Sequence, residues 1–173
     1  MTEYTYRLVT ADDPTLAYAA YEQLKADDSL KFYDYEFGKA LSPERFVAHN
    51  VSRYSVFLAG FVNGAYAGFM TLRPISPVSR CALIGVAGFR RWYRQAIPLS
   101  QGAFAFCYAN LNVDSMIAHV VRTNYHITRL CRACGFAKLA EAPGMYFDCE
   151  TDKYTSGYIL LSTPQLLRAA MEV

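Results

Sequence analysis

Two clusters in this sequence have residue types that could bind a ligand or react. Cys131 and Cys134 form a Cys-x-x-Cys pair, a spacing that zinc and redox sites use. No second pair or suitably spaced histidines complete a zinc site, so we interpret the pair as two small apolar helix residues and expect no metal. Arg90, Arg91 and Arg94 precede an expected helix start, where guanidinium groups suit an anion. The alternative to anion binding is that these arginines form a basic turn exposed to solvent.

Single titratable side chains give weaker signals. His119 stands inside the apolar run 115–121, where a lone histidine is more often part of the core than a base. Glu36 and Asp34 lie among the aromatic residues of segment 32–37. Such a segment could line a cleft for cationic or aromatic groups, or its rings could pack on a sheet. His49 and His126 are weaker candidates for a catalytic base than His119.

Composition narrows the class of protein. The 173 residues are 53% hydrophobic and 18% charged, which predicts a single globular domain over 1–173. The net charge of +2 gives no support for binding to nucleic acid or to an anionic membrane, although arginines beside Trp92 and Tyr93 could stack bases. The N-terminus lacks a signal peptide pattern, and no run of about 18 apolar residues predicts a membrane span. Five scattered cysteines suggest reduced thiols and a cytoplasmic location.

The elements that would position these residues alternate between strand and helix patterns. Strands are expected at 4–10, 55–62, 65–72, 81–89, 115–121, 136–147 and 157–161, and helices at 14–27, 42–50, 96–110, 125–134 and 164–171. Asn63-Gly64 predicts a tight hairpin, and Gly135 a left-handed helix end. A helix between runs 81–89 and 115–121 implies a parallel crossover. We therefore predict an α/β (α+β) fold with a mixed sheet of about seven strands and four or five helices.

This order resembles the GNAT superfamily of N-acyltransferases over nearly the whole chain. The most specific piece is segment 120–136, VVRTNYHITRLCRACGF, which is similar to the family's strand-Asn-helix-Gly-Phe signature. The resemblance implies acetyl-coenzyme A as cofactor, in a crevice where 81–89 and 115–121 run parallel and then separate. It implies cofactor contacts from the main chain of Val86 and Gly88, from the side chain of Asn124, and from the helix start at Gln95 and Ala96.

The sequence departs from the family pattern at three points. Arg94 replaces the central glycine of the pyrophosphate loop, although Arg90 and Arg91 could compensate. Cys131 stands where many members have a tyrosine that protonates the departing thiolate, and an ordinary thiol has a comparable pKa of about 8.5. No acid lies on strand 81–89, so His119 and Glu36 are the candidate bases.

Two hypotheses of function follow from the resemblance. The first is a GNAT-type N-acetyltransferase that acts on an unidentified amine, either a small molecule or a protein. The second is a GNAT-fold protein without catalysis that binds a protein partner or assembles with copies of itself. The altered loop and the arginine-aromatic turn are similar to those of degenerate phage and prophage GNAT-like proteins, which would place the chain in a virion.

Overall fold

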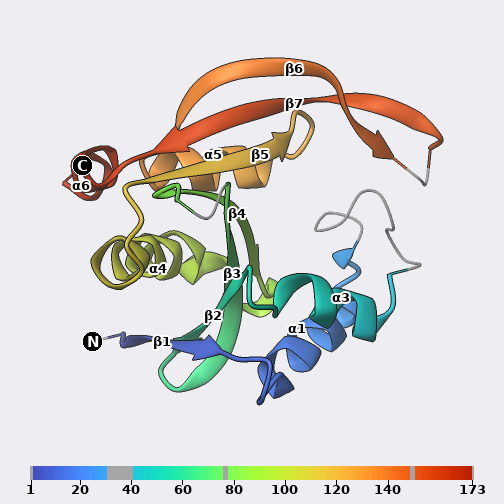
Figure 1. Cartoon of the computed structure of the whole chain (residues 1–173), viewed down its shortest axis with the longest axis vertical. Helices are drawn as coiled ribbons and strands as arrows, with labels where there is room; N and C mark the ends of the chain where they lie inside the picture. The colour runs from blue at the N-terminus through green and yellow to red at the C-terminus, as the bar shows by residue number, and fades with distance from the viewer. Residues whose placement is uncertain (1, 31–40, 76–77, 149–150, 173) are drawn as a thin grey trace.

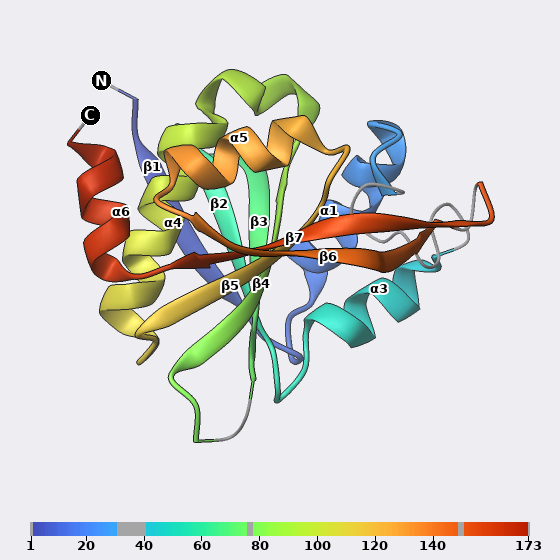
Figure 2. The ribbon, with the colours of Figure 1, turned by 90° about the horizontal axis from the view of Figure 1, so that it is seen from above.

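The computed structural model describes residues 2–30, 41–75, 78–148 and 151–172 as one mixed sheet with helices on both faces (Figures 1 and 2). The strand order is β1-β2-β3-β4-β5-β7-β6. The strands are β1 (Tyr4–Val9), β2 (Val56–Val62), β3 (Ala65–Pro74), β4 (Cys81–Gly88), β5 (Ser115–Val121), β6 (Ala137–Asp148) and β7 (Lys153–Ser162). The helices are α1 (Thr15–Ala26), α3 (Pro43–Asn50), the 3₁₀ helix η2 (Arg90–Gln95), α4 (Ala96–Asn110), α5 (Tyr125–Ala133) and α6 (Pro164–Met171).

Local signals place these elements. Asn63 and Gly64 have φ of 49° and 77°, the left-handed conformations that a two-residue hairpin between β2 and β3 requires. Ser42 caps α3 by accepting from the Arg45 N–H at 3.2 Å. Gly135 ends α5 with φ of 76°, and a Cβ there would lie 2.4 Å from the Leu166 carbonyl oxygen, so only glycine fits. The predictions of the hairpin and of the left-handed helix end are confirmed, and α3 lies within the helix expected at 42–50.

The core has two apolar layers, one on each face of the sheet. Side chains such as Met70, Ile84 and Met116 pack with Phe104 and Cys131 of α4 and α5. The opposite layer joins the sheet to α1 and α3 through residues that include Ala20, Phe46, Phe57 and Phe69. Figure 2 shows α4 and α6 on one side of the sheet, and α1 and α3 on the other. Successive strand residues therefore point to opposite helical layers.

The sheet divides where its two parallel strands meet. β4 and β5 pair only from Cys81–Ser115 to Ile84–Ala118. Beyond these pairs β4 stays with β3, and β5 stays with β7. The two strands therefore separate toward their C-terminal ends, as the crevice prediction required.

Some boundaries differ from the sequence prediction. Segment 90–95 is the 3₁₀ helix η2, which continues directly into α4, and not an open turn. β7 begins at Lys153, earlier than expected, because it pairs along most of β6. β3 extends beyond Leu72 to Pro74, which brings Arg73 into the sheet opposite Leu83. None of the helices within the described ranges is long and apolar enough to cross a bilayer.

Candidate active site

The opening between β4 and β5 exposes main-chain groups of both strands. Phe89 donates its N–H to the Ala67 carbonyl on β3 at 2.9 Å. Because main-chain groups alternate in direction along a strand, those of Val86 and Gly88 point away from β3 and into the opening. The Ser115 N–H contacts the Arg80 carbonyl on the β4 side at 3.3 Å, so the same alternation turns the main chain of His119 into the opening. Both walls thus offer strand-like donors and acceptors.

A cavity of about 200 Å³ lies in this opening. It is lined by parts of β3, β4, β5, α3, α5 and β6. The lining side chains that can donate, accept or titrate are His49, Thr71, Arg73, His119, Asn124, Cys131 and Tyr146. Four of the sequence-predicted site residues, Val86, His119, Asn124 and Cys131, are therefore brought together.

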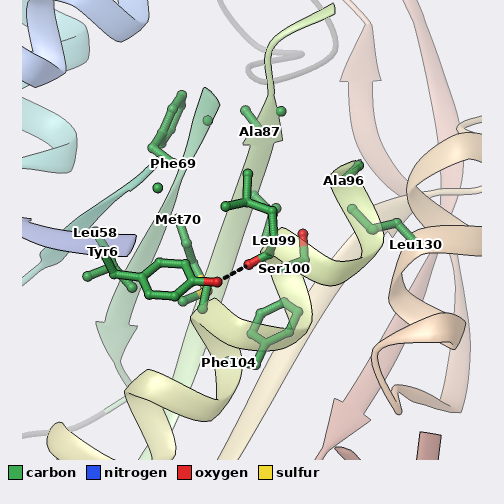
Figure 3. Close-up of a pocket in the computed structure, with 15 residues that line it drawn as sticks. Tyr6, Leu58, Phe69, Met70, Ala87, Ala96, Leu99, Ser100, Phe104 and Leu130 are labelled. Atoms are coloured by element: carbon green, nitrogen blue, oxygen red, sulfur yellow. Dashed lines mark hydrogen bonds between the residues drawn. The ribbon is translucent and has the colours of Figure 1, made fainter. Parts of the chain in front are cut away.

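A smaller cavity of about 30 Å³ lies where α4 begins, and Val86 lines both cavities. Gly88, Ala96 and Leu130 also line it, and Figure 3 shows Ala96 beside Leu130 at this end of the pocket. The Tyr6 hydroxyl donates to the Leu99 carbonyl at 2.8 Å and fixes α4 against β1. The two cavities share Val86 as a lining residue, so they adjoin at β4.

Asn124 begins α5 directly after β5. Its Oδ1 accepts from the Ile127 N–H at 3.3 Å, and its carbonyl accepts from the Thr128 hydroxyl at 3.1 Å. The amide is held at the helix start by these bonds. Its Nδ2 has no acceptor among the residues that the structure describes, so it can donate into the cavity.

His119 faces α3, on the opposite side of β5 from the buried Ala118 and Val120. The side chain is exposed to the cavity, so it is not a core histidine. Partial desolvation by the cavity walls lowers the pKa of His119 below its ordinary value of 6.5. A neutral imidazole at pH 7 can accept a proton.

Cys131 lines the cavity from α5, but only 5% of its surface is exposed. Burial raises the pKa of the Cys131 thiol to about 12. The thiol is therefore protonated at neutral pH and is a weak acid. Among the described cysteines, Cys107, Cys131 and Cys134 are buried free thiols, and Cys81 is partly exposed. The described residues include no cluster of three or more metal-binding side chains.

The arginines of η2 are exposed and lead into α4. The Arg90 N–H donates to Asp27 Oδ2 at 2.8 Å, and the Arg91 guanidinium lies 5.1 Å from the Trp92 ring centre. Arg94 is also exposed, and neither Trp92 nor Arg94 lines the two cavities. The 3₁₀ helix uses amides internally, as in the Ala96 N–H bond to the Tyr93 carbonyl. Anion binding here must therefore depend on the guanidinium groups more than on free amides.

Gln95 was predicted to contact the cofactor, but its side chain binds a residue of β1. Its Oε1 accepts from the Tyr4 hydroxyl at 2.5 Å, which ties the start of α4 to β1. Glu36 and Asp34 lie outside the described residues.

Sequence reasoning missed Thr71, Arg73 and Tyr146 as cavity residues and ranked His49 low. Period-two alternation with Phe69 could have placed Thr71 and Arg73 on one face of β3. No local signal could have found Tyr146, because the pairing of β6 with β7 brings it to the cavity.

The overall fold is similar to that of several solved structures. The chain aligns with spermidine N-acetyltransferase from Vibrio cholerae in complex with CoA and spermine, with a TM-score of 0.73 and 15% identity over 95% of this chain and 98% of that one. The ribosomal L7/L12 α-N-protein acetyltransferase RimL, in complex with coenzyme A, gives a TM-score of 0.74 and 15% identity over 92% and 94% of the two chains. An acetyltransferase of the GNAT family from Streptococcus pneumoniae gives 0.69 and 15% over 93% and 99%.

No protein-family model and no curated protein sequence matches the chain. At this level of identity the structural likeness establishes the fold and not the activity. The chain has the GNAT fold, and the sequence prediction of that fold is confirmed.

Proposed function

We propose that this protein is a GNAT-type N-acetyltransferase that transfers an acetyl group from acetyl-coenzyme A to an amine. The observation that carries the proposal is the separation of β4 and β5 beyond Ile84 and Ala118 around a cavity of about 200 Å³. Unpaired strand edges are rarely left inside a sheet, because buried main-chain groups need partners. An extended amide-containing arm that enters the opening would supply those partners.

The residues that line the two cavities fit such a ligand. Val86 and Gly88 would donate and accept through their main chains, and Asn124 would donate through Nδ2. Arg90, Arg91 and Arg94 would bind phosphate groups from the surface beside the start of α4. Acetyl-coenzyme A supplies an acetyl group activated as a thioester.

This chain's own groups then provide orientation and proton transfer. The Val86 N–H would stabilise negative charge on a carbonyl oxygen in the opening. His119 would take a proton from the attacking amine, since its lowered pKa keeps the imidazole neutral at pH 7. Cys131 lines the α5 side of the cavity, but its raised pKa makes the thiol a poor proton donor. Alignment of the two reactants accounts for the remaining rate enhancement.

One observation favours the second candidate, a GNAT-fold binding or assembly protein without catalysis. The segment that should offer free amides to phosphate is a 3₁₀ helix with Arg94 at the glycine position. In that case the chain would contact a protein partner or its own copies, and a virion location would follow if the resemblance to phage proteins also holds.

Calorimetric titration with acetyl-coenzyme A separates the two candidates. We expect binding by the wild type and at least tenfold weaker binding by Gly88→Val, because a side chain at Gly88 would project into open space beside the opening. Gly88→Ala should give an intermediate loss, and the melting temperatures of all three should agree. No binding by the wild type at millimolar ligand would refute the enzyme proposal.

A further inference from the structure

Arg73 places a guanidinium in the part of the cavity that faces α3. It shares one face of β3 with Thr71 and Phe69, the face opposite to Met70 and Leu72, and it lines the cavity. His119 lies on the same side of the sheet. The coenzyme contacts proposed above come from the strand edges and from α5. Arg73 makes none of these contacts, so it is available to bind the molecule that carries the acceptor amine in the part of the cavity that faces α3.

The Arg73 guanidinium is half-buried, and no carboxylate of the described part of the chain pairs with it. Its Nη2 contacts Asn50 Oδ1 at 3.5 Å, a long hydrogen bond to a buried amide. None of the ion pairs within the described ranges includes Arg73. A partly desolvated cation without an anion is costly, so an anionic ligand would bind there favourably.

The charged side chains among the described lining residues of the cavity have one sign. Its titratable lining residues are Arg73, the two histidines 49 and 119, Cys131 and Tyr146, and no Asp or Glu is among the lining residues that the structure describes. Such a lining repels a polyamine, which carries several positive charges, and it attracts a carboxylate. Arginine binds carboxylates through two parallel hydrogen bonds, which also fixes their orientation.

We infer that the acceptor is an amine that also carries a carboxylate, and that Arg73 binds the carboxylate. The inference rests on the proposed acetyl transfer and specifies its substrate class. Arg73 pairs with Leu83, three residues before Val86, so the two sites lie about 10 Å apart along the strand, before the reach of the arginine side chain is subtracted. An acceptor with several bonds between amine and carboxylate would span that distance.

The test compares each amino acid with its counterpart that lacks the carboxylate. The panel contains ω-amino acids of two to six carbons with the matching alkylamines, and lysine with 1,5-diaminopentane. We expect wild-type kcat/KM to favour the acids by about 10- to 100-fold, the range of a charge-assisted hydrogen-bonded pair. Dependence on chain length would measure the distance from Arg73 to the reacting amine.

Variants assign the preference to Arg73. Arg73→Gln should abolish it by raising KM for the acids and leaving the alkylamines unchanged, and Arg73→Lys should retain part of it. Arg168→Gln, at an exposed position on α6, is the matched control and should keep the wild-type ratio. A wild-type ratio near one, a preference for diamines, or a ratio that persists in Arg73→Gln would overturn the inference.

Two binding measurements separate this inference from the proposed function. Arg73→Gln should bind acetyl-coenzyme A and melt as the wild type does, so a loss confined to the acids is a loss of acceptor recognition. If the wild type binds no acetyl-coenzyme A, acetyl transfer is refuted. Calorimetry of the best-fitting ω-amino acid then decides about Arg73 alone: binding that Arg73→Gln removes supports the carboxylate site, and absent or unchanged binding overturns it.

Discussion

His119 is the side chain whose protonation should control the reaction. It faces the cavity from β5, and desolvation lowers its pKa below 6.5. The imidazole must be neutral to accept a proton, so kcat should be constant near pH 7 and fall only as pH drops through a pKa below 6.5. His119→Gln should lower kcat about 100-fold and remove this acidic limb.

The matched control is His126→Gln, because His126 is exposed on α5 and does not line the cavity. This variant should keep the wild-type pH profile of kcat, measured at saturating acceptor. An acidic limb that survives in His119→Gln would assign the base to another group.

Burial makes the Cys131 thiol a poor proton donor, although a thiol can in principle donate a proton. Its thiol has a pKa of about 12, whereas an ordinary thiol leaving group has a pKa of about 8.5, so proton transfer from Cys131 is uphill by roughly 5 kcal/mol. We expect Cys131→Ala to change kcat by less than about threefold. Cys134→Ala is the control, since Cys134 is also buried with a raised pKa but does not line the cavity. A 100-fold loss of kcat in Cys131→Ala alone would identify Cys131 as the proton donor.

At the scale of elements, η2 decides how the phosphates are held. Its amides bond within the 3₁₀ helix, so the arginine side chains should supply the affinity. Arg91→Glu and Arg94→Glu together should weaken acetyl-coenzyme A binding at least tenfold, and more at low salt, because exposed charges are screened. Binding of acetyl-pantetheine, which lacks the phosphates, should stay unchanged. Arg168→Glu controls for net charge, and equal losses for both ligands would show that η2 shapes the opening instead.

At the scale of the whole molecule, the two apolar layers share one sheet and should unfold together. Trp92, the single tryptophan, packs against the layer of α1 and α3 and also against the cluster of Val62, Ala67 and Leu99, so its fluorescence reports the packing where the start of α4 meets the sheet. Circular dichroism reports the strands and helices of both faces. We expect one thermal transition with the same midpoint by both probes. Acetyl-coenzyme A at 100 times its Kd should stabilise the protein by about 2.7 kcal/mol and move both curves together. Two separate midpoints would contradict a single domain over 1–173.

Local signals in the sequence determined the elements and their order. The Asn63-Gly64 turn, the Ser42 cap and Gly135 each depend on backbone geometry within a few residues, so they can be recognised without a fold. The parallel relation of β4 and β5 followed from the helix between them, whereas the crevice between these strands was implied by the resemblance to the GNAT superfamily. The resemblance to the GNAT superfamily pointed to Val86 and Asn124 as crevice residues, and the position of His119 in strand 115–121 pointed to that side chain; the structure places all three at the cavity.

Only the tertiary structure decided which side chains share the cavity and in what state. Arg73 and Tyr146 reach it because β3 continues past Leu72 and β6 pairs back along β7, and these pairings connect distant segments. The pKa values of His119 and Cys131 depend on desolvation by neighbours that are remote in sequence. Spacing along a chain fixes periodicity and capping, whereas burial and charge pairing depend on the packing of the whole sheet.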